Sequence, residues 1–325
     1  MLIKRIFVFL FVVSVTVLMA FQISGAIEKK LRFVYITDLN LYHTPNSTQT
    51  KKHINELKNG ILVYESQAIF QELIRELNKK INPDFIVFGG NNISDSSPAE
   101  KLWQLFLDIS SEINTDLLIC FGKNEIKNYS TFDLSKSLSN FSINSTRTWY
   151  SKMFGDYLFI VLDTVSLLNN KNIAIEQLNW LKSTLLKNKH FITVIIVADS
   201  FFYSHDDLSK NKYFNSLEEI ISQNPQVKLV LSGGNYLNRS SFKDSTVYLD
   251  SASTTVYPCT FRIIELGHNE LSVQTLPISL KGVIKKAEKS ILDSDLAKNS
   301  FPSSPVQIKA FLSGHRVEQQ FTRSF

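Results

Sequence analysis

Short apolar runs alternate with longer amphipathic stretches along most of the chain. The runs are β-branched, aromatic and continuous rather than alternating, which is typical of strands covered on both faces. They predict strands over residues 31–37, 84–88, 116–121, 157–163, 191–197 and 227–231. Apolar residues recur at helical spacing over residues 63–80, 100–113, 175–186 and 217–221. Strands separated by helices predict a layered α/β domain.

The pattern changes toward the C-terminus. Residues 245–250, 261–266 and 271–276 are strand-like with no long helix between them, so we expect antiparallel strands that close a second sheet. Residues 280–296 are helical in pattern, and Pro302 and Pro305 then interrupt any element. We therefore predict one main domain over residues 27–276, followed by a C-terminal helix and a loosely held tail over residues 277–325.

The first 26 residues have the pattern of a secretory signal peptide. Lys4 and Arg5 precede an almost wholly apolar run over residues 6–21, and small residues follow at Ser24, Gly25 and Ala26. Cleavage after Ala26 is the prediction, with an uncleaved membrane anchor as the alternative. Either outcome places the body of the protein outside the cytoplasm, as a secreted, cell-surface or periplasmic protein or one of the secretory pathway.

Composition narrows the class only modestly. The chain is 44% hydrophobic and 20% charged, as globular proteins are. Without residues 1–26 the net charge is +3 and basic runs are absent, so nothing suggests nucleic acid as a partner. The two cysteines, Cys120 and Cys259, exclude a disulfide scaffold. A buried free thiol at Cys120 is favoured over a single bridge.

Candidate chemistry lies just after the predicted strands, because layered α/β domains bind ligands beyond the carboxyl ends of their strands. The segments concerned are Asp38-Leu39-Asn40, Gly90-Asn91-Asn92, Gly122-Lys123-Asn124-Glu125, Asp199-Ser200 and Gly233-Gly234-Asn235-Tyr236.

This succession resembles the calcineurin-like metallophosphoesterase family. The family's motifs run Asp-x-His, Gly-Asp, Gly-Asn-His-Asp/Glu, a lone His and Gly-His-x-His, each after a strand. The flanks FVYITDLNL, PDFIVFGGNN and VKLVLSGGNY are similar to the strands that lead into the first, second and last motifs, and DYLFIVLDT and EQLNWLKSTL resemble the family's middle strand and following helix. The resemblance covers about residues 31–276 and implies a four-layer α/β/β/α sandwich.

The resemblance also implies a site with two divalent metals, but most ligand positions are substituted. Asp38 keeps the family residue, and so does Glu125, which flanks the site. The substituted positions are Asn40 for the first histidine, Asn91 for the bridging aspartate, Lys123 for the ligand asparagine, Asn124 for the catalytic histidine, Asp199 for the lone histidine, and Gly234 and Tyr236 for the last two histidines.

These substitutions weaken metal binding for electrostatic reasons. Two dications about 3.5 Å apart repel strongly, and a neutral amide at Asn91 removes the carboxylate that would lie between them. Lys123 adds a cation, and Gly234 has no donor atom. We expect no catalytic residue and no cofactor. The alternative is one weakly bound Mg²⁺ or Ca²⁺ on the oxygens of Asp38, Asn91 and Asp199.

The lysine at position 123 suggests a structural role in place of metal binding. An ion pair between Lys123 and Asp38 or Asp199 would replace the metals electrostatically, since unpaired aspartates in a cleft are costly. Of the six histidines, His43 and His205 lie near the first and fourth motifs, and we interpret them as exposed loop residues.

Two functional hypotheses follow from the sequence. The first is a catalytically degenerate, extracytoplasmic protein that keeps the metallophosphoesterase scaffold to bind an unidentified partner. The second is an active phosphoric ester hydrolase, a phosphatase or phosphodiesterase, with a divergent site that holds one metal. A membrane would be a partner only if the N-terminal segment remains as an anchor.

Overall fold

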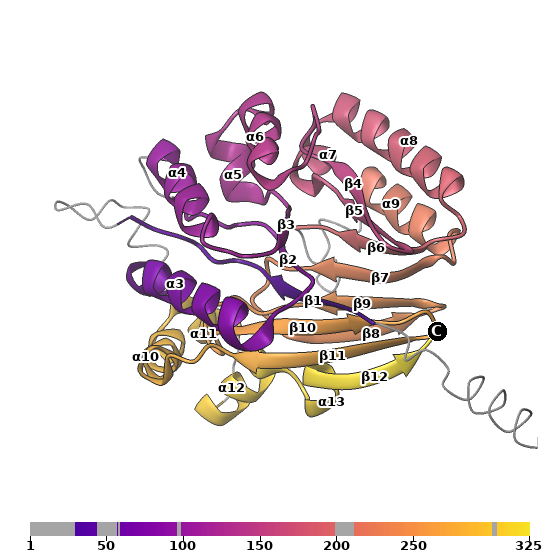
Figure 1. Cartoon of the computed structure of the whole chain (residues 1–325). Coiled ribbons are helices and arrows are strands. Elements are labelled where there is room, and N and C mark those ends of the chain that lie inside the picture. Colours follow the sequence, from indigo (N-terminus) through magenta and orange to yellow (C-terminus); the bar gives the residue numbers. More distant parts are fainter. Residues whose placement is uncertain (1–29, 44–56, 58, 96–98, 199–210, 301–303) are drawn as a thin grey trace, which may run out of the picture.

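Two six-stranded sheets form the centre of the computed structural model, which describes residues 30–43, 57, 59–95, 99–198, 211–300 and 304–325 (Figure 1). The predicted signal peptide and Asp199 lie outside these residues. Within these ranges no helix combines the length and the apolar character needed to cross a bilayer.

The first sheet has the strand order β12-β11-β10-β1-β2-β3. Its strands are β1 (Leu31–Ile36), β2 (Phe85–Phe88), β3 (Asp116–Ile119), β10 (Thr260–Leu266), β11 (Glu270–Pro277) and β12 (Gln320–Ser324). β1, β2 and β3 are parallel, whereas β10, β11 and β12 pair antiparallel with their neighbours. The carboxyl ends of β1 and β2 therefore meet at one edge of the sheet.

The second sheet has the order β4-β5-β6-β7-β9-β8. It contains β4 (Tyr150–Phe154), β5 (Tyr157–Val161), β6 (Ile192–Ile196), β7 (Val227–Ser232), β8 (Arg239–Lys243) and β9 (Thr246–Asp250). β5, β6, β7 and β9 are parallel, and β4 and β8 are antiparallel edge strands.

Helices cover the outer faces of both sheets. The α-helices that precede β7 are α3 (Ser66–Glu76), α4 (Ala99–Ser110), α5 (Lys123–Asn128), α6 (Thr131–Ser137), α7 (Thr164–Asn169), α8 (Lys171–Lys187) and α9 (Lys212–Ser222). A π-helical turn, Leu77–Ile81, extends α3. Apolar residues of α7, α8 and α9 pack with the second sheet, and those of α3 and α4 pack with the first. The predicted four-layer sandwich is confirmed.

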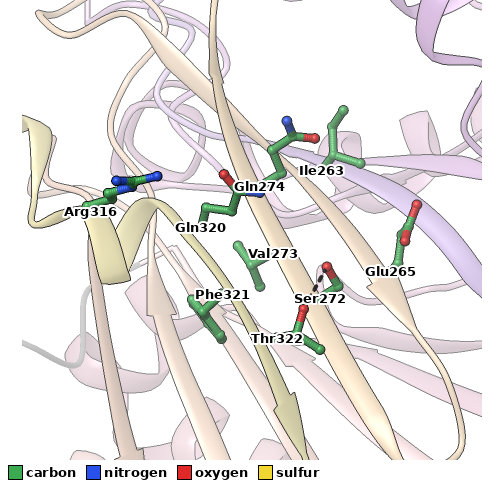
Figure 2. A pocket seen from close by; sticks show the side chains of 9 residues that line it. All are labelled: Ile263, Glu265, Ser272, Val273, Gln274, Arg316, Gln320, Phe321 and Thr322. Carbon is green, nitrogen blue, oxygen red and sulfur yellow. Dashed lines mark hydrogen bonds between the residues drawn. The ribbon is translucent and has the colours of Figure 1, made fainter.

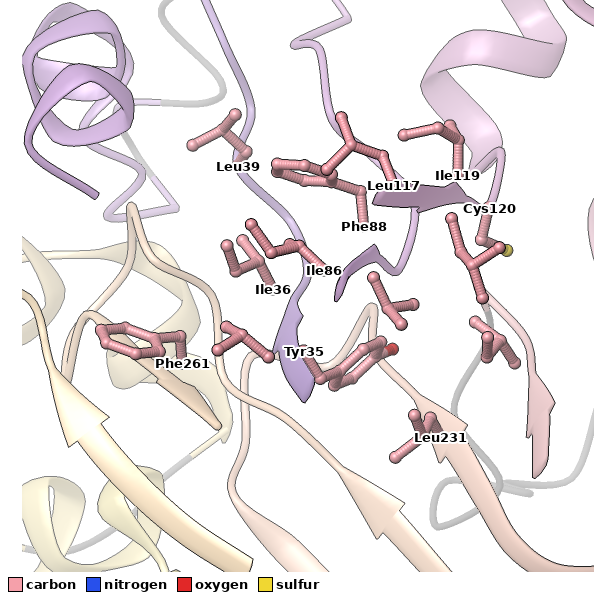
Figure 3. Packing of buried hydrophobic residues seen from close by; sticks show 14 of the residues in the cluster. Tyr35, Ile36, Leu39, Ile86, Phe88, Leu117, Ile119, Cys120, Leu231 and Phe261 are labelled. Atoms are coloured by element: carbon pink, nitrogen blue, oxygen red, sulfur yellow. The ribbon is translucent and has the colours of Figure 1, made fainter. Parts of the chain in front are cut away.

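Aromatic side chains join the two sheets. Phe33 of β1 stacks on Phe85 of β2 at a ring distance of 5.0 Å and meets Phe159 of β5 edge-on at 5.3 Å. Figure 3 shows how side chains of β1, β2, β3 and β7 pack together in this core. Cys120 and Cys259 are both buried free thiols, as favoured for Cys120.

Two expectations about the second half are wrong. Residues 246–250, 260–266 and 270–277 do not close a single sheet: β9 pairs parallel with β7, whereas β10 and β11 join the first sheet. The chain crosses between the sheets through residues 251–259, most of which are buried.

The C-terminal segment is not a loosely held tail. It forms α10 (Lys281–Leu292), α11 (Asp295–Ser300), α12 (Pro305–Ser313) and α13 (Arg316–Gln319), and β12 then pairs with β11. Ile291, Ile308 and Leu312 are buried in a cluster with Ile61 and Val63. The helices therefore share a core with the main domain.

Candidate functional site

The candidate site lies where β1 and β2 end, and two loops pair there through their backbones. The amide nitrogens of Asp38 and Asn40 donate to the carbonyl oxygens of Gly90 and Asn91, each at 3.0 Å. Asp38, Asn40 and Asn91 all have φ near +50°. Aspartate and asparagine tolerate this left-handed conformation better than other side chains do. The backbone alone therefore favours these two residue types here.

Asp38 is the centre of the site and is fully buried. Its Oδ1 accepts a hydrogen bond from Asn91 Nδ2 at 2.9 Å. Its Oδ2 accepts one from the Gly234 backbone N–H at 2.8 Å and one from the Thr37 hydroxyl at 3.0 Å. All three of these donors are neutral groups.

Asn91 stands where the resemblance implies the bridging aspartate, and both ends of its amide form hydrogen bonds. Nδ2 donates to Asp38, and Oδ1 accepts from the backbone N–H of Asn124 at 3.2 Å. The reversed amide would place its oxygen against a carboxylate oxygen and its NH₂ against an N–H. The network therefore fixes one orientation, with a donor facing Asp38.

Asn40 turns away from Asp38's carboxylate although it is buried. Its Nδ2 donates to the carbonyl oxygen of Asp38 at 2.8 Å and to the hydroxyl of Thr255 at 3.2 Å. Ser253 and Thr255 also donate to that carbonyl. Sequence reasoning missed these two hydroxyl residues, because they follow β9 in a polar segment with no motif.

Glu125 clamps the loops beneath the site. It is fully buried, and its carboxylate accepts from the backbone N–H groups of Gly122, Ile93 and Asn91 at 2.7, 2.9 and 3.1 Å. Burial raises its pKa to about 7, because desolvation outweighs the opposing effect of these hydrogen bonds. The sequence placed Glu125 beside the site, and the structure gives it a supporting position there.

Of the other candidate residues from the sequence, some lie in the site and others do not. Asn124 lies in the site, where its side chain donates to the carbonyl oxygen of Ile93. Lys123 begins α5 with an exposed side chain, and none of the described ion pairs includes it. Tyr236 packs against the apolar cluster that contains Tyr42 and Leu237. The predicted pairing of Lys123 with Asp38 is therefore wrong, since neutral groups take that position.

Asp199 cannot be placed, but the residue before it can. A Cβ at Gly234 would lie 3.2 Å from the carbonyl oxygen of Ala198, and a Cβ at Gly90 would lie 2.9 Å from the Cβ of Ala198. The end of β6 therefore reaches the same edge as the loops after β2 and β7.

A second concave region lies elsewhere, on the outer face of β10, β11 and β12 (Figure 2). It has a volume of about 420 Å³, and Glu265, Ser272, Gln274 and Thr322 project into it. Its one acidic side chain, Glu265, already pairs with Arg32 at 3.5 Å. It offers polar surface without a cluster of reactive groups.

Sequence comparisons give no match, either with models of protein families or among characterised proteins. Comparison of the fold with solved structures does give matches. A dimetal phosphatase from Danio rerio matches with a TM-score of 0.56 and 13% identity, covering 77% of this chain and 99% of the phosphatase. GAP50, described as the anchor in the inner membrane complex of Plasmodium, matches with a TM-score of 0.55 and 16% identity, covering 79% of this chain and 87% of GAP50.

These likenesses, together with the two sheets and their helix layers, define the class. The chain has the calcineurin-like metallophosphoesterase fold. At these identities the likeness concerns the fold, so function has to be argued from the side chains of the site.

Proposed function

We propose that this chain is a catalytically degenerate metallophosphoesterase-like protein that works outside the cytoplasm by binding a partner. The observation that carries the proposal is the amide of Asn91. It joins the Asp38 carboxylate to the backbone of Asn124 where the family has a bridging carboxylate.

The side chains present fit a pair of divalent metals poorly. Asn91 presents N–H, and not oxygen, to Asp38, and its oxygen is already bonded to Asn124. Gly234 contributes only a backbone N–H, which is directed at Asp38. Within the described ranges, no three His, Cys, Asp or Glu side chains are grouped as metal ligands. Hydrogen bonds, in place of metal ions, stabilise the charge of Asp38.

Two observations support the binding role and its location. GAP50, whose fold this chain shares, is described as the anchor in the inner membrane complex of Plasmodium. Residues 1–26 carry the signal-peptide pattern, which directs the body of the protein out of the cytoplasm. An anchoring or scaffolding role needs the shape of the fold and not its metals.

Metal-dependent thermal stability tests the proposal. The chain from Ile27 to Phe325 is purified, its metal content is measured, and it is melted with Mn²⁺, Zn²⁺ or Mg²⁺ in excess or with a chelator. A ligand at a hundred times its Kd adds about 2.7 kcal/mol, a clear rise in Tm. We expect no bound metal, no rise in Tm and no hydrolysis of p-nitrophenyl phosphate esters.

The opposite outcome is equally informative. A rise in Tm with a single equivalent of metal, together with phosphoesterase activity that the chelator abolishes, would support the divergent one-metal hydrolase instead. The matched variant is Asp38→Asn, which removes the retained family ligand and should abolish any such metal effect.

A further inference from the structure

Several asparagines of the chain are followed, after one intervening residue, by serine or threonine. They are Asn46, Asn92, Asn128, Asn140, Asn144 and Asn238. This Asn-x-Ser/Thr sequence, the sequon, is the acceptor of N-linked glycans in secreted proteins. A glycan is bulky and hydrophilic, so it needs an asparagine whose side chain reaches solvent in the folded protein. The structure therefore separates sequons that the sequence leaves equivalent, except for Asn46, which lies outside the described residues.

Two of the sequons are buried in the fold. Asn92 and Asn238 have exposed fractions of 0% and 1%. The side-chain amide of Asn92 donates to the carbonyl oxygen of Cys120 at 3.1 Å, and that of Asn238 donates to the hydroxyl of Thr260 at 3.1 Å. A sugar on either nitrogen would need space that a closely packed interior does not have. The folded protein therefore excludes a glycan at both positions.

Two further sequons begin in helical turns. Asn128, the last residue of α5, is half-buried, and its side-chain amide donates to the carbonyl oxygen of Asn124 at 2.7 Å. Asn140, in the 3-10 turn Leu138–Phe141, is exposed, but its amide donates to the carbonyl oxygen of Ser137 at 2.9 Å. Both amides are thus held against the backbone of their own turn.

Asn144 combines an exposed side chain with a position outside helices and strands. Ile143 before it is buried in the core, and Ser145 after it is half-buried, whereas Thr146, which supplies the hydroxyl of the sequon, is exposed. The amide and the hydroxyl of this sequon therefore both face solvent. Among the interactions of the described residues, none uses the Asn144 amide.

The residues after Asn144 hold the loop in place without using its side chain. The hydroxyl of Ser145 donates to the carbonyl oxygen of Arg147 at 2.9 Å and accepts from the N–H of the same residue at 3.1 Å. Arg147 pairs with Glu176 of α8, and its guanidinium lies 5.4 Å from the ring centre of Trp149, which is buried. A group attached to Asn144 would disturb none of these contacts.

We propose that Asn144 carries an N-linked glycan. A secretory oligosaccharyltransferase supplies the reaction, with an oligosaccharide on a lipid diphosphate as the donor. The bond between sugar C1 and the diphosphate oxygen breaks, C1 bonds to Nδ2 of Asn144, the amide nitrogen releases one proton, and the lipid diphosphate leaves. This inference rests on the location outside the cytoplasm proposed above. A bulky hydrophilic group keeps this loop in solvent, so the partner of the binding role contacts another face.

Mapping of each sequon on the secreted protein tests the proposal. The chain is expressed in a glycosylating eukaryotic host, once with its own residues 1–26 and once with these replaced by a signal peptide of proven function. Peptide N-glycosidase in heavy-oxygen water converts each glycosylated asparagine to a labelled aspartate, which mass spectrometry locates. We expect label at Asn144 in most secreted chains, less at Asn140 and none at Asn92 or Asn238.

Variants of the sequon separate the acceptor from the fold. Asn144→Gln and Thr146→Ala each remove the sequon, whereas Thr146→Ser retains it and is the matched control. We expect the first two proteins to lose the mass of one glycan and the third to keep it. The same variants are made without glycans in bacteria. Both side chains are exposed, so we expect melting temperatures equal to that of the wild type.

Two results would overturn the proposal. One is a secreted protein, produced with the proven signal peptide, that has no label at Asn144. The other is label at Asn140 with none at Asn144. Label at Asn144 with the proven signal peptide, but not with residues 1–26, would support the glycan site and contradict the proposed location outside the cytoplasm. The two failures are therefore distinguishable.

Discussion

At the scale of single residues, Asn91 decides the character of the site. Its amide donates to Asp38 and accepts from Asn124, so one neutral side chain stabilises a buried carboxylate and joins two loops. An aspartate there would lose the donor and place a second carboxylate beside the first.

Asn91→Asp should therefore destabilise the protein in the presence of a chelator. We expect the free energy of unfolding to fall by about 1–3 kcal/mol at neutral pH, the cost of leaving a buried polar group without its hydrogen bond. Urea denaturation measures it. Lys123→Asn is the control: its side chain is exposed, so we expect a change within about 0.5 kcal/mol. Equal stability of the two variants would contradict the role given to Asn91.

The raised pKa of Glu125 predicts that the stability of the fold depends on pH. Its pKa rises from 4.5 to about 7 on folding, so the folded state holds a proton that the unfolded state releases. Its contribution to stability is therefore fully present below pH 4.5 and is lost as the pH rises toward 7. The size is on the order of 3 kcal/mol, since each pKa unit corresponds to about 1.4 kcal/mol.

The measurement is a comparison with Glu125→Gln, which lacks the titrating group. Unfolding free energies are measured from pH 4 to pH 8 for both proteins. We expect wild-type stability to fall relative to the variant over the window from about 4.5 to 7. Parallel profiles would mean that Glu125 titrates alike in the folded and unfolded states.

At the scale of elements, β12 shows why edge strands escape sequence patterns. Only Phe321 is apolar in Gln320–Ser324, because one face of an edge strand meets solvent. The same holds for β8, where Phe242 is the one apolar residue. Phe321 and Phe242 meet edge-on at 5.7 Å, so the edges of the two sheets contact each other there.

Phe321→Ala should reveal whether β12 is firmly held. We expect a loss of about 1–3 kcal/mol, because the ring packs against the core and Phe242 and is only partly buried. Thr322→Ala in the same strand is the control, since that side chain is exposed. The melting temperatures of both variants are compared with that of the wild type. A Phe321→Ala protein that melts with the wild type would indicate a weakly attached strand.

At the scale of the whole molecule, Arg262 joins layers that the sequence separates. It is fully buried in β10, and its guanidinium donates to the backbone oxygens of Asp250 at the end of β9 and Glu318 in α13, and to Thr275. Burial lowers its pKa to about 10, so it stays charged at neutral pH. One side chain thus connects both sheets and the C-terminal helices.

Arg262→Met should be strongly destabilising. The variant keeps the volume but removes the buried positive charge near Asp250 and the three hydrogen bonds that the guanidinium donates. We expect a loss of about 3–5 kcal/mol in urea denaturation. Arg262→Lys retains the charge without the forked geometry of the guanidinium. Its stability should lie between that of the wild type and that of Arg262→Met. A methionine variant of wild-type stability would show that this network contributes nothing net.

The fold was predictable to the extent that strands are buried on both faces. The continuous apolar runs at β1, β2, β5, β6 and β7 gave their order and class, and Asp38, Asn91, Asn124 and Gly234 do gather at one edge as the succession of motifs suggests. The half-exposed strands β4, β8 and β12 were not predicted, because their polar faces break the pattern.

The sequence by itself determined the layered α/β class and the resemblance to metallophosphoesterases, with the ligand positions that the resemblance implies, because apolar periodicity and motif order are local properties of the chain. Only the tertiary structure decided how those positions are used. Asn40 bonds to Thr255, 215 residues away, and Asp38 bonds to Gly234, 196 residues away. Contacts over such separations depend on how the sheets pack, and that packing turns the ligand positions into a hydrogen-bonded network around one carboxylate.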